Sequence, residues 1–209
     1  RRKLTEAALS AARRGERLTH QLLAFSRRQA LRPESVDVNV LIREGDPLIR
    51  GALGGSMTYR TRLRRGGARV RVDTAQFEAA LLNLLVNARD AVGGKGRVEV
   101  ETRRLKIKAG EIRDLEPGDY VRISVSDDGP GIPDEVRERI FEPFYTTKAV
   151  GKGTGLGLSQ VYGFLKQSGG AIHVVTGPGE GTRMEMYLPV ALGIEPALAE
   201  PTRIPSTAG

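Results

Sequence analysis

The chain has 209 residues, of which 39% are hydrophobic, and it contains no run of apolar residues long enough to span a membrane, so a soluble fold with one main domain is expected. It has no cysteine, which excludes disulfides and thiolate metal sites. The formal net charge of +8 comes from arginines and lysines scattered along the chain without interleaved aromatic residues, a distribution that argues against a nucleic-acid partner.

A helix is predicted at the N-terminus. Between Leu4 and Phe25, small or apolar residues recur at alternating steps of four and three, which is typical of a helix that packs along another helix. A helix lying on its own domain would give the same pattern. We favour half of a helical hairpin or dimer bundle, because a polar stretch and Pro33 separate it from the rest of the chain, and we expect its partner helix to precede residue 1 in a longer protein.

The remainder of the chain predicts a mixed α/β domain followed by a tail. In chain order we expect an extended stretch at 35–39, a helix through Leu53 that Pro47 delays or kinks, strands at 57–63 and 69–73 around a Gly-Gly turn, an apolar helix at 74–92, strands near 97–102 and 121–125, a helix at 154–168, and strands at 171–176 and 182–188. The Ala- and Pro-rich segment 191–209 predicts a linker or an untethered end.

A first candidate site lies on the apolar helix. Asn83, Asn87 and Asp90 are spaced i, i+4 and i+7, so they share one face of it. Oxygen ligands suit Mg²⁺, which completes its coordination with water and phosphate oxygens. The alternative to a metal site is that these polar residues only cap the helix or face solvent. We favour the metal site, because amides buried on so apolar a helix need hydrogen-bond or metal partners.

Two glycine-rich segments come after this helix. Asp127 ends a predicted strand, where its carboxylate can accept a hydrogen bond from an exocyclic amine while Gly129 and Gly131 let a base approach, although an ordinary turn has the same composition. The loop 151–158 opens a helix, so its free N–H groups can bind phosphate. It matches neither a Walker A loop nor a dinucleotide-binding fingerprint.

Taken in order, these motifs resemble those of the sensor histidine kinases of two-component systems. NLLVNARDA (83–91) is similar to their asparagine box, DDGPGIP (127–133) to the first glycine box, FEPFYTTK (141–148) to the phenylalanine box and GKGTGLGL (151–158) to the second glycine box. LTHQLLAFSRRQ (18–29) resembles the second helix of the dimerisation and phosphotransfer hairpin, and GTRMEMYLP (181–189) the closing strand.

The resemblance implies a two-layer α/β sandwich of the histidine kinase, gyrase and chaperone ATPase type, with ATP under a mobile lid. It implies a partial hairpin helix at 1–32, a catalytic ATP-binding domain at 33–190 and a linker or disordered tail at 191–209. The implied activity is transfer of the γ-phosphoryl group of Mg-ATP to a histidine of a dimerisation hairpin, for relay to an aspartate of a response regulator. The implied setting is the bacterial cytoplasm, with a homodimeric full-length protein.

The resemblance also assigns site residues. It implies that Asn87 coordinates Mg²⁺ with Asn83 and Asp90 beside it, and that Asp127 binds the adenine amine. The remaining positions that it assigns are Gly129 and Gly131 beside the base, Thr182 near the adenine, Lys148 and the amides of Gly153, Thr154, Gly155, Leu156, Gly157 and Leu158 near the phosphates, and Phe141 and Phe144 packing the lid.

Two departures from related proteins carry information. The ATPases of the wider class have a glutamate at the Asn83 position to activate water, and an amide cannot accept that proton, so bound ATP should be held for transfer. Asp90 stands where many histidine kinases have Lys or His, a form similar to the subgroup of hybrid kinases. The tail would then lead to a receiver domain.

Neither histidine fits the acceptor motif of the family. His20 is followed by Gln21 and Leu22 rather than an acidic residue, and His173 lies in a predicted strand, so we interpret both as structural or surface residues and expect the acceptor upstream of Arg1. Two alternatives stay open: a kinase or ATPase of the same fold with another acceptor, and a module that binds nucleotide or dimerises without transferring phosphate.

Overall fold

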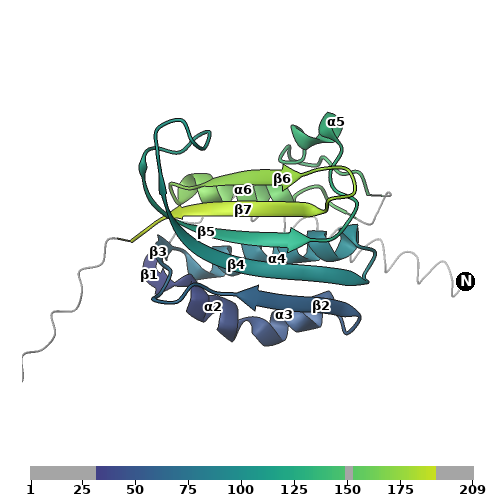
Figure 1. Cartoon of the computed structure of the whole chain (residues 1–209), viewed down its shortest axis with the longest axis horizontal. Helices are drawn as coiled ribbons and strands as arrows, with labels where there is room; N and C mark the ends of the chain where they lie inside the picture. The colour runs from purple at the N-terminus through teal and green to yellow at the C-terminus, as the bar shows by residue number, and fades with distance from the viewer. Residues whose placement is uncertain (1–31, 149–152, 192–209) are drawn as a thin grey trace, which may run out of the picture.

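The computed structural model describes residues 32–148 and 153–191, so the predicted N-terminal helix with His20, and most of the predicted tail, lie outside the described residues. In chain order the elements are β1 (Glu34–Asp37), α2 (Val38–Glu44), α3 (Asp46–Leu53), β2 (Met57–Arg62), β3 (Arg69–Val72), α4 (Thr74–Ala91), β4 (Gly96–Ile107), β5 (Gly118–Asp127), α5 (Asp134–Arg137), α6 (Gly157–Gln167), β6 (Ala171–Thr176) and β7 (Thr182–Pro189). A mixed sheet forms one layer and helices form the other (Figure 1), which confirms the predicted two-layer α/β sandwich.

The main sheet has five strands in the order β2-β4-β5-β7-β6. β2 runs parallel to β4, and the other neighbours are antiparallel. The strands predicted around the Gly66-Gly67 turn exist but do not pair with each other: β2 joins the main sheet, and β3 pairs with β1 in a separate antiparallel ribbon. One bridge between Val70 and Val190 ties this ribbon to the end of β7.

Helix α4 is the central element of the helical layer. Its N-cap is Asp73, whose side chain accepts the Gln76 N–H at 3.1 Å, and it ends before Gly93 and Gly94, which both have positive φ. Its apolar side, including Phe77, Leu84 and Leu85, is buried against the sheet. The face with Asn83, Asn87 and Asp90 is therefore left half-buried.

The region 38–53 differs in detail from the single helix expected there. Gly45 separates two helices, and Pro47 lies in the first turn of the second one, where its missing N–H removes no hydrogen bond. The proline thus sets the start of α3.

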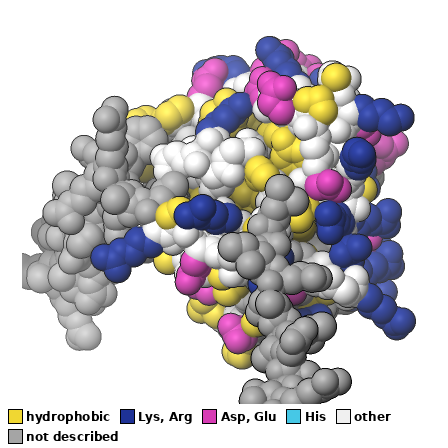
Figure 2. Space-filling model, turned by 90° about the vertical axis from the view of Figure 1, so that its left-hand side faces the viewer, with side chains coloured by type: hydrophobic (Ala, Val, Ile, Leu, Met, Phe, Trp, Pro, Cys, Tyr) yellow, Lys and Arg dark blue, Asp and Glu magenta, His cyan; other side chains and the backbone are white. Residues whose placement is uncertain are grey.

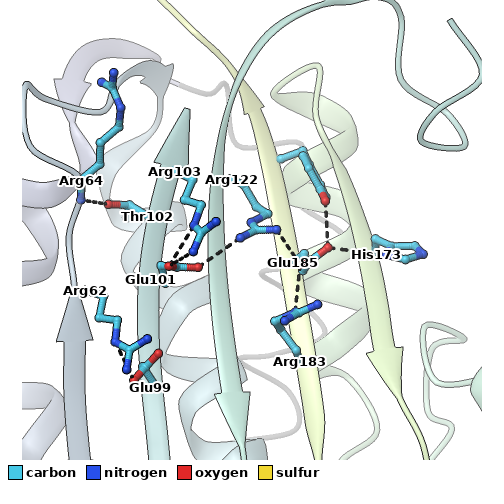
Figure 3. A network of polar contacts seen from close by, with 11 residues as sticks. Arg62, Arg64, Glu99, Glu101, Thr102, Arg103, Arg122, His173, Arg183 and Glu185 are labelled. Carbon is cyan, nitrogen blue, oxygen red and sulfur yellow. Dashed lines mark hydrogen bonds and ion pairs between the residues drawn. The ribbon is translucent and has the colours of Figure 1, made fainter. Parts of the chain in front are cut away.

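The face of the sheet away from α4 and α6 carries a network of charged residues (Figure 3). Arg122 on β5 donates to Glu101 on β4 and to Glu185 on β7, each at 3.1 Å. Glu185 is only 4% exposed, accepts the Tyr187 hydroxyl at 2.8 Å, and lies 3.6 Å from His173 Nδ1. His173 is thus a surface residue of this network, as predicted.

We expect Arg122→Met to lower the free energy of unfolding by about 2 kcal/mol, because the buried Glu185 would lose one of its two guanidinium partners and keep only the more exposed Arg183. Arg62→Met is the matched control, since Arg62 also pairs with a glutamate across strands but is 67% exposed, and its loss should cost less than about 0.5 kcal/mol. Urea unfolding followed by circular dichroism measures both changes, and equal losses would contradict the prediction.

On the face drawn in Figure 2, lysine and arginine side chains gather toward one side with acidic side chains among them, so this face carries both signs of charge. Among the residues that the structure describes, no helix is long and apolar enough to cross a bilayer.

Candidate functional site

The predicted site residues meet along one helix, α4. Near its middle, Gly157 at the start of α6 lies so close that an added Cβ would be 3.4 Å from Asn83 Oδ1. At its last turn, an added Cβ on Gly129 would be 3.4 Å from Ala91 Cβ. Between these points Lys148 reaches across to Asn87 and Asp90. The asparagine box therefore contacts both glycine boxes and the end of the phenylalanine box.

Lys148 and Asp90 form the charged centre of this arrangement. Lys148 Nζ lies 2.6 Å from Asp90 Oδ2 and 3.2 Å from Asn87 Oδ1. Arg89 Nη2 lies 2.6 Å from the other carboxylate oxygen, Asp90 Oδ1. Burial acts to raise the pKa of Asp90, but the hydrogen bonds from Lys148 and Arg89 outweigh it and leave this pKa below its ordinary value. Asp90 is thus an ionised bridge between two cations.

A second polar group forms where three strands end. Asp127 ends β5 and pairs with Thr182, the first residue of β7, which pairs in turn with Thr176, the last residue of β6. Asp127 Oδ1 accepts the Gly129 N–H at 3.0 Å, and the Thr176 and Thr182 hydroxyl oxygens are 3.3 Å apart. Burial raises the pKa of Asp127 against the opposing effect of backbone hydrogen bonds from Gly129 and Thr182.

Two glycines of this site are required by close backbone contacts. Gly131 has φ +81°, and a Cβ there would collide with the carbonyl oxygen of Gly177 in the β6–β7 turn. Gly155 has φ +67°, and a Cβ there would collide with the carbonyl group of Phe144, whose N–H donates to the Gly155 carbonyl at 2.9 Å. These glycines hold the two boxes against neighbouring loops.

Residues 72–192 match the family described as "Histidine kinase-, DNA gyrase B-, and HSP90-like ATPase", and this range contains all four boxes. The chain belongs to this family. Within it the chain is similar to the sensor kinase CckA of Brucella abortus, with 45% identity over 181 residues that cover 85% of this chain and 19% of CckA. The chain therefore spans about a fifth of the length of that relative.

Solved histidine kinase structures share its fold. Full-length ShkA in complex with AMPPNP gives a TM-score of 0.64 at 26% identity, covering 82% of this chain and 34% of that one. ThkA in complex with the response regulator protein TrrA gives a TM-score of 0.63 at 26% identity, covering 87% of this chain and 48% of that one.

The described part of the second glycine box, residues 153–158, is loop up to Leu156. Helix α6 begins at Gly157, three residues later than expected at 154. Leu156 is buried and Leu158 half-buried, so at these two positions only the backbone groups are suited to contact phosphate. Of the two aromatic residues predicted to pack a lid, Phe141 lies near Tyr162 with ring centroids 5.9 Å apart, whereas Phe144 is 56% exposed and does not pack as predicted.

The oxygens on α4 fit a magnesium ion. The described residues contain no group of three or more His, Cys, Asp or Glu side chains that could hold a metal by themselves. Mg²⁺ needs no such group, because it binds through one or two protein oxygens together with water and phosphate. Asn87 Oδ1 and Asp90 Oδ2 already converge on one cation, the ammonium of Lys148.

Three residues that the fold brings to the site were not predicted from the sequence. Thr176 accepts the Ile132 N–H at 2.9 Å beside Thr182, Gln160 Oε1 lies 3.4 Å from Asn83 Nδ2, and Arg89 anchors Asp90. Arg89 adjoins Asp90 in sequence and could have been considered. The other two come close only through strand register and helix packing.

Proposed function

We propose that this chain is the ATP-binding core of a sensor histidine kinase. It binds Mg-ATP and transfers the γ-phosphoryl group to a histidine on a dimerisation hairpin, from which the group passes to an aspartate of a response regulator. The observation that supports this most directly is that Lys148 and both glycine boxes lie against the asparagine box on α4. The full-length protein would act as a homodimer with its kinase core in the bacterial cytoplasm.

Asp127 provides base recognition in this proposal. Its carboxylate, half-buried at the end of β5, would accept a hydrogen bond from the exocyclic amine of adenine. Thr182, buried and 3.3 Å from Thr176, would place a hydroxyl beside the base. The site would therefore prefer a purine with an amine at that position over one with a carbonyl. A carbonyl oxygen would face the carboxylate oxygen with no proton to share between them.

The phosphates would lie between α4 and the second glycine box. Backbone N–H groups of residues 153–158 and the Lys148 ammonium would bind phosphate oxygens. Asn87 and Asp90 would hold Mg²⁺, which neutralises phosphate charge when it is bound. Asn83 is half-buried beside Gly157, and its amide cannot remove a proton from water, so the chain would retain ATP rather than hydrolyse it quickly.

The phosphate acceptor would come from another helix. His173 is half-exposed and lies on the sheet face opposite α4, next to Glu185, because its strand neighbours Ile172 and Val174 pack into the core. It is therefore remote from the site on the helical side. The CckA and ShkA relatives are much longer than this chain, which is consistent with a hairpin supplied outside the described residues.

We expect Asn87→Ala to abolish most of the effect of Mg²⁺ on nucleotide binding. Calorimetric titration with a non-hydrolysable ATP analogue should show wild-type affinity raised about tenfold or more by Mg²⁺, and Asn87→Ala should bind nearly equally with and without the metal. Asn83→Ala, the same change one turn away, should weaken binding in both conditions alike. A metal effect of wild-type size in Asn87→Ala would contradict this ligand assignment.

Transfer itself is tested by adding a separate hairpin that carries the acceptor histidine. Labelled phosphate should appear on the hairpin and not on this chain. Nucleotide binding without any transfer would favour the binding-module alternative, and rapid release of inorganic phosphate would favour an ATPase.

A further inference from the structure

The ammonium of Lys148 occupies the meeting point of the two oxygens best suited to a divalent cation. Its distances of 2.6 Å to Asp90 Oδ2 and 3.2 Å to Asn87 Oδ1 are those of ammonium hydrogen bonds. Magnesium–oxygen bonds are shorter, about 2.0–2.1 Å, and the ion attracts the same lone pairs. The ammonium and the metal therefore cannot both hold this pair of oxygens.

The two cations that flank Asp90 differ in how firmly they are held. Arg89 lies on α4 itself, and its Nη1 also donates to the Ala52 carbonyl of α3 at 2.6 Å, which fixes the guanidinium between two helices. Lys148 lies at the end of the phenylalanine box, 33% exposed, with its stem along Gly153. Of the two, Lys148 can leave by rotation of its own side chain.

We propose that Lys148 is an internal counter-ion of the metal site, which the divalent cation displaces from Asn87 and Asp90 and which thereby becomes available to the phosphates. This inference rests on the proposed function for the place of the metal. With Arg89 and Lys148 beside Asp90, the cluster carries one net positive charge and disfavours a bare divalent ion. A metal that arrives together with nucleotide phosphates brings acceptors for the displaced ammonium.

The test is the binding of Mn²⁺ alone, measured from the electron paramagnetic resonance signal of the free ion, with no nucleotide present. Lys148→Met should bind Mn²⁺ about tenfold more tightly than wild type, because no ammonium competes for the oxygens. Lys166→Met is the matched control. Lys166 lies in the last turn of α6, and its Nζ is 3.1 Å from Asp114 Oδ2, so it forms a comparable ion pair elsewhere in the chain. It should leave Mn²⁺ affinity unchanged.

A second pair of variants separates competition from a general charge effect. If Lys148 competes for the Asp90 carboxylate, most of the gain from Lys148→Met should vanish when Asp90→Asn is also present. No gain in Lys148→Met, an equal gain in Lys166→Met, or a gain that persists in full with Asp90→Asn would each overturn the proposal. The Mn²⁺ measurement contains no nucleotide, so it is independent of titration with the ATP analogue. Failure to bind the analogue would refute the proposed function, and it would not produce any of the Mn²⁺ results above.

Discussion

We expect Asp127→Asn to weaken binding of an ATP analogue about a hundredfold and, at the same time, to raise the unfolding temperature of the protein. The asparagine side chain has only one acceptor oxygen. If that oxygen accepts the Gly129 N–H, the amide N–H groups point at the adenine amine, so the hydrogen bond to the base is lost and two donors face each other. Calorimetric titration measures the affinity. Asp128→Asn is the control, since Asp128 is exposed and its oxygen can still accept the Arg97 N–H.

The gain in stability arises from the pKa of Asp127, which burial raises above its ordinary value. A carboxyl group of this kind binds its proton more tightly in the folded chain, so its contribution to stability declines as pH rises through the raised pKa. At neutral pH the half-buried charge is unfavourable, and the neutral amide should raise the unfolding temperature by about 1–3 °C. Below the ordinary pKa the advantage should disappear. Wild-type affinity in Asp127→Asn would refute the base-recognition role.

We expect Gly131→Ala to lower the free energy of unfolding by about 4 kcal/mol, because the methyl group collides with the Gly177 carbonyl and the residue must keep φ +81°. Gly179→Ala is the matched control: Gly179 has φ +78° in the neighbouring turn, but a Cβ there meets nothing within 4 Å. Its cost should be about 1 kcal/mol, from backbone conformation alone.

Urea unfolding of both glycine variants measures the difference. The contact between the two loops also includes the Gly179 N–H, which donates to the Pro130 carbonyl at 2.8 Å. Gly131→Ala should therefore also shift Asp127 and weaken nucleotide binding, whereas Gly179→Ala should not. Equal destabilisation by the two variants would show that the close approach of the loops contributes little.

The glycine at position 131 marks a limit of sequence interpretation. The sequence predicts that it leaves room for a nucleotide base, and the structure gives it a reason that needs no ligand, the contact with Gly177. Both reasons require glycine. A sequence pattern records that a side chain is excluded at a position, but not which neighbour excludes it.

Element positions were predictable wherever the local pattern was strong. Helix α4 was expected at 74–92 and spans Thr74–Ala91, and β6 was expected at 171–176 and spans those residues. Strand pairing was not predictable in the same way: β2 and β3 flank a tight turn, yet β2 pairs with β4 and β3 with β1. Apolar alternation identifies a strand and its buried face, but the partner strand depends on how the whole sheet fits the helices.

The sequence by itself determined the order of the boxes and the face of α4 that carries Asn83, Asn87 and Asp90, because spacing along one element is a local property. The two-layer sandwich was implied by the resemblance of those boxes to a known family. Only the tertiary structure decided that Lys148 pairs with Asp90 across 58 residues, that Thr176 joins Thr182, and that Arg122 joins two glutamates on other strands. These contacts depend on distances between elements, which packing of the sheet against α4 and α6 fixes and no single segment encodes.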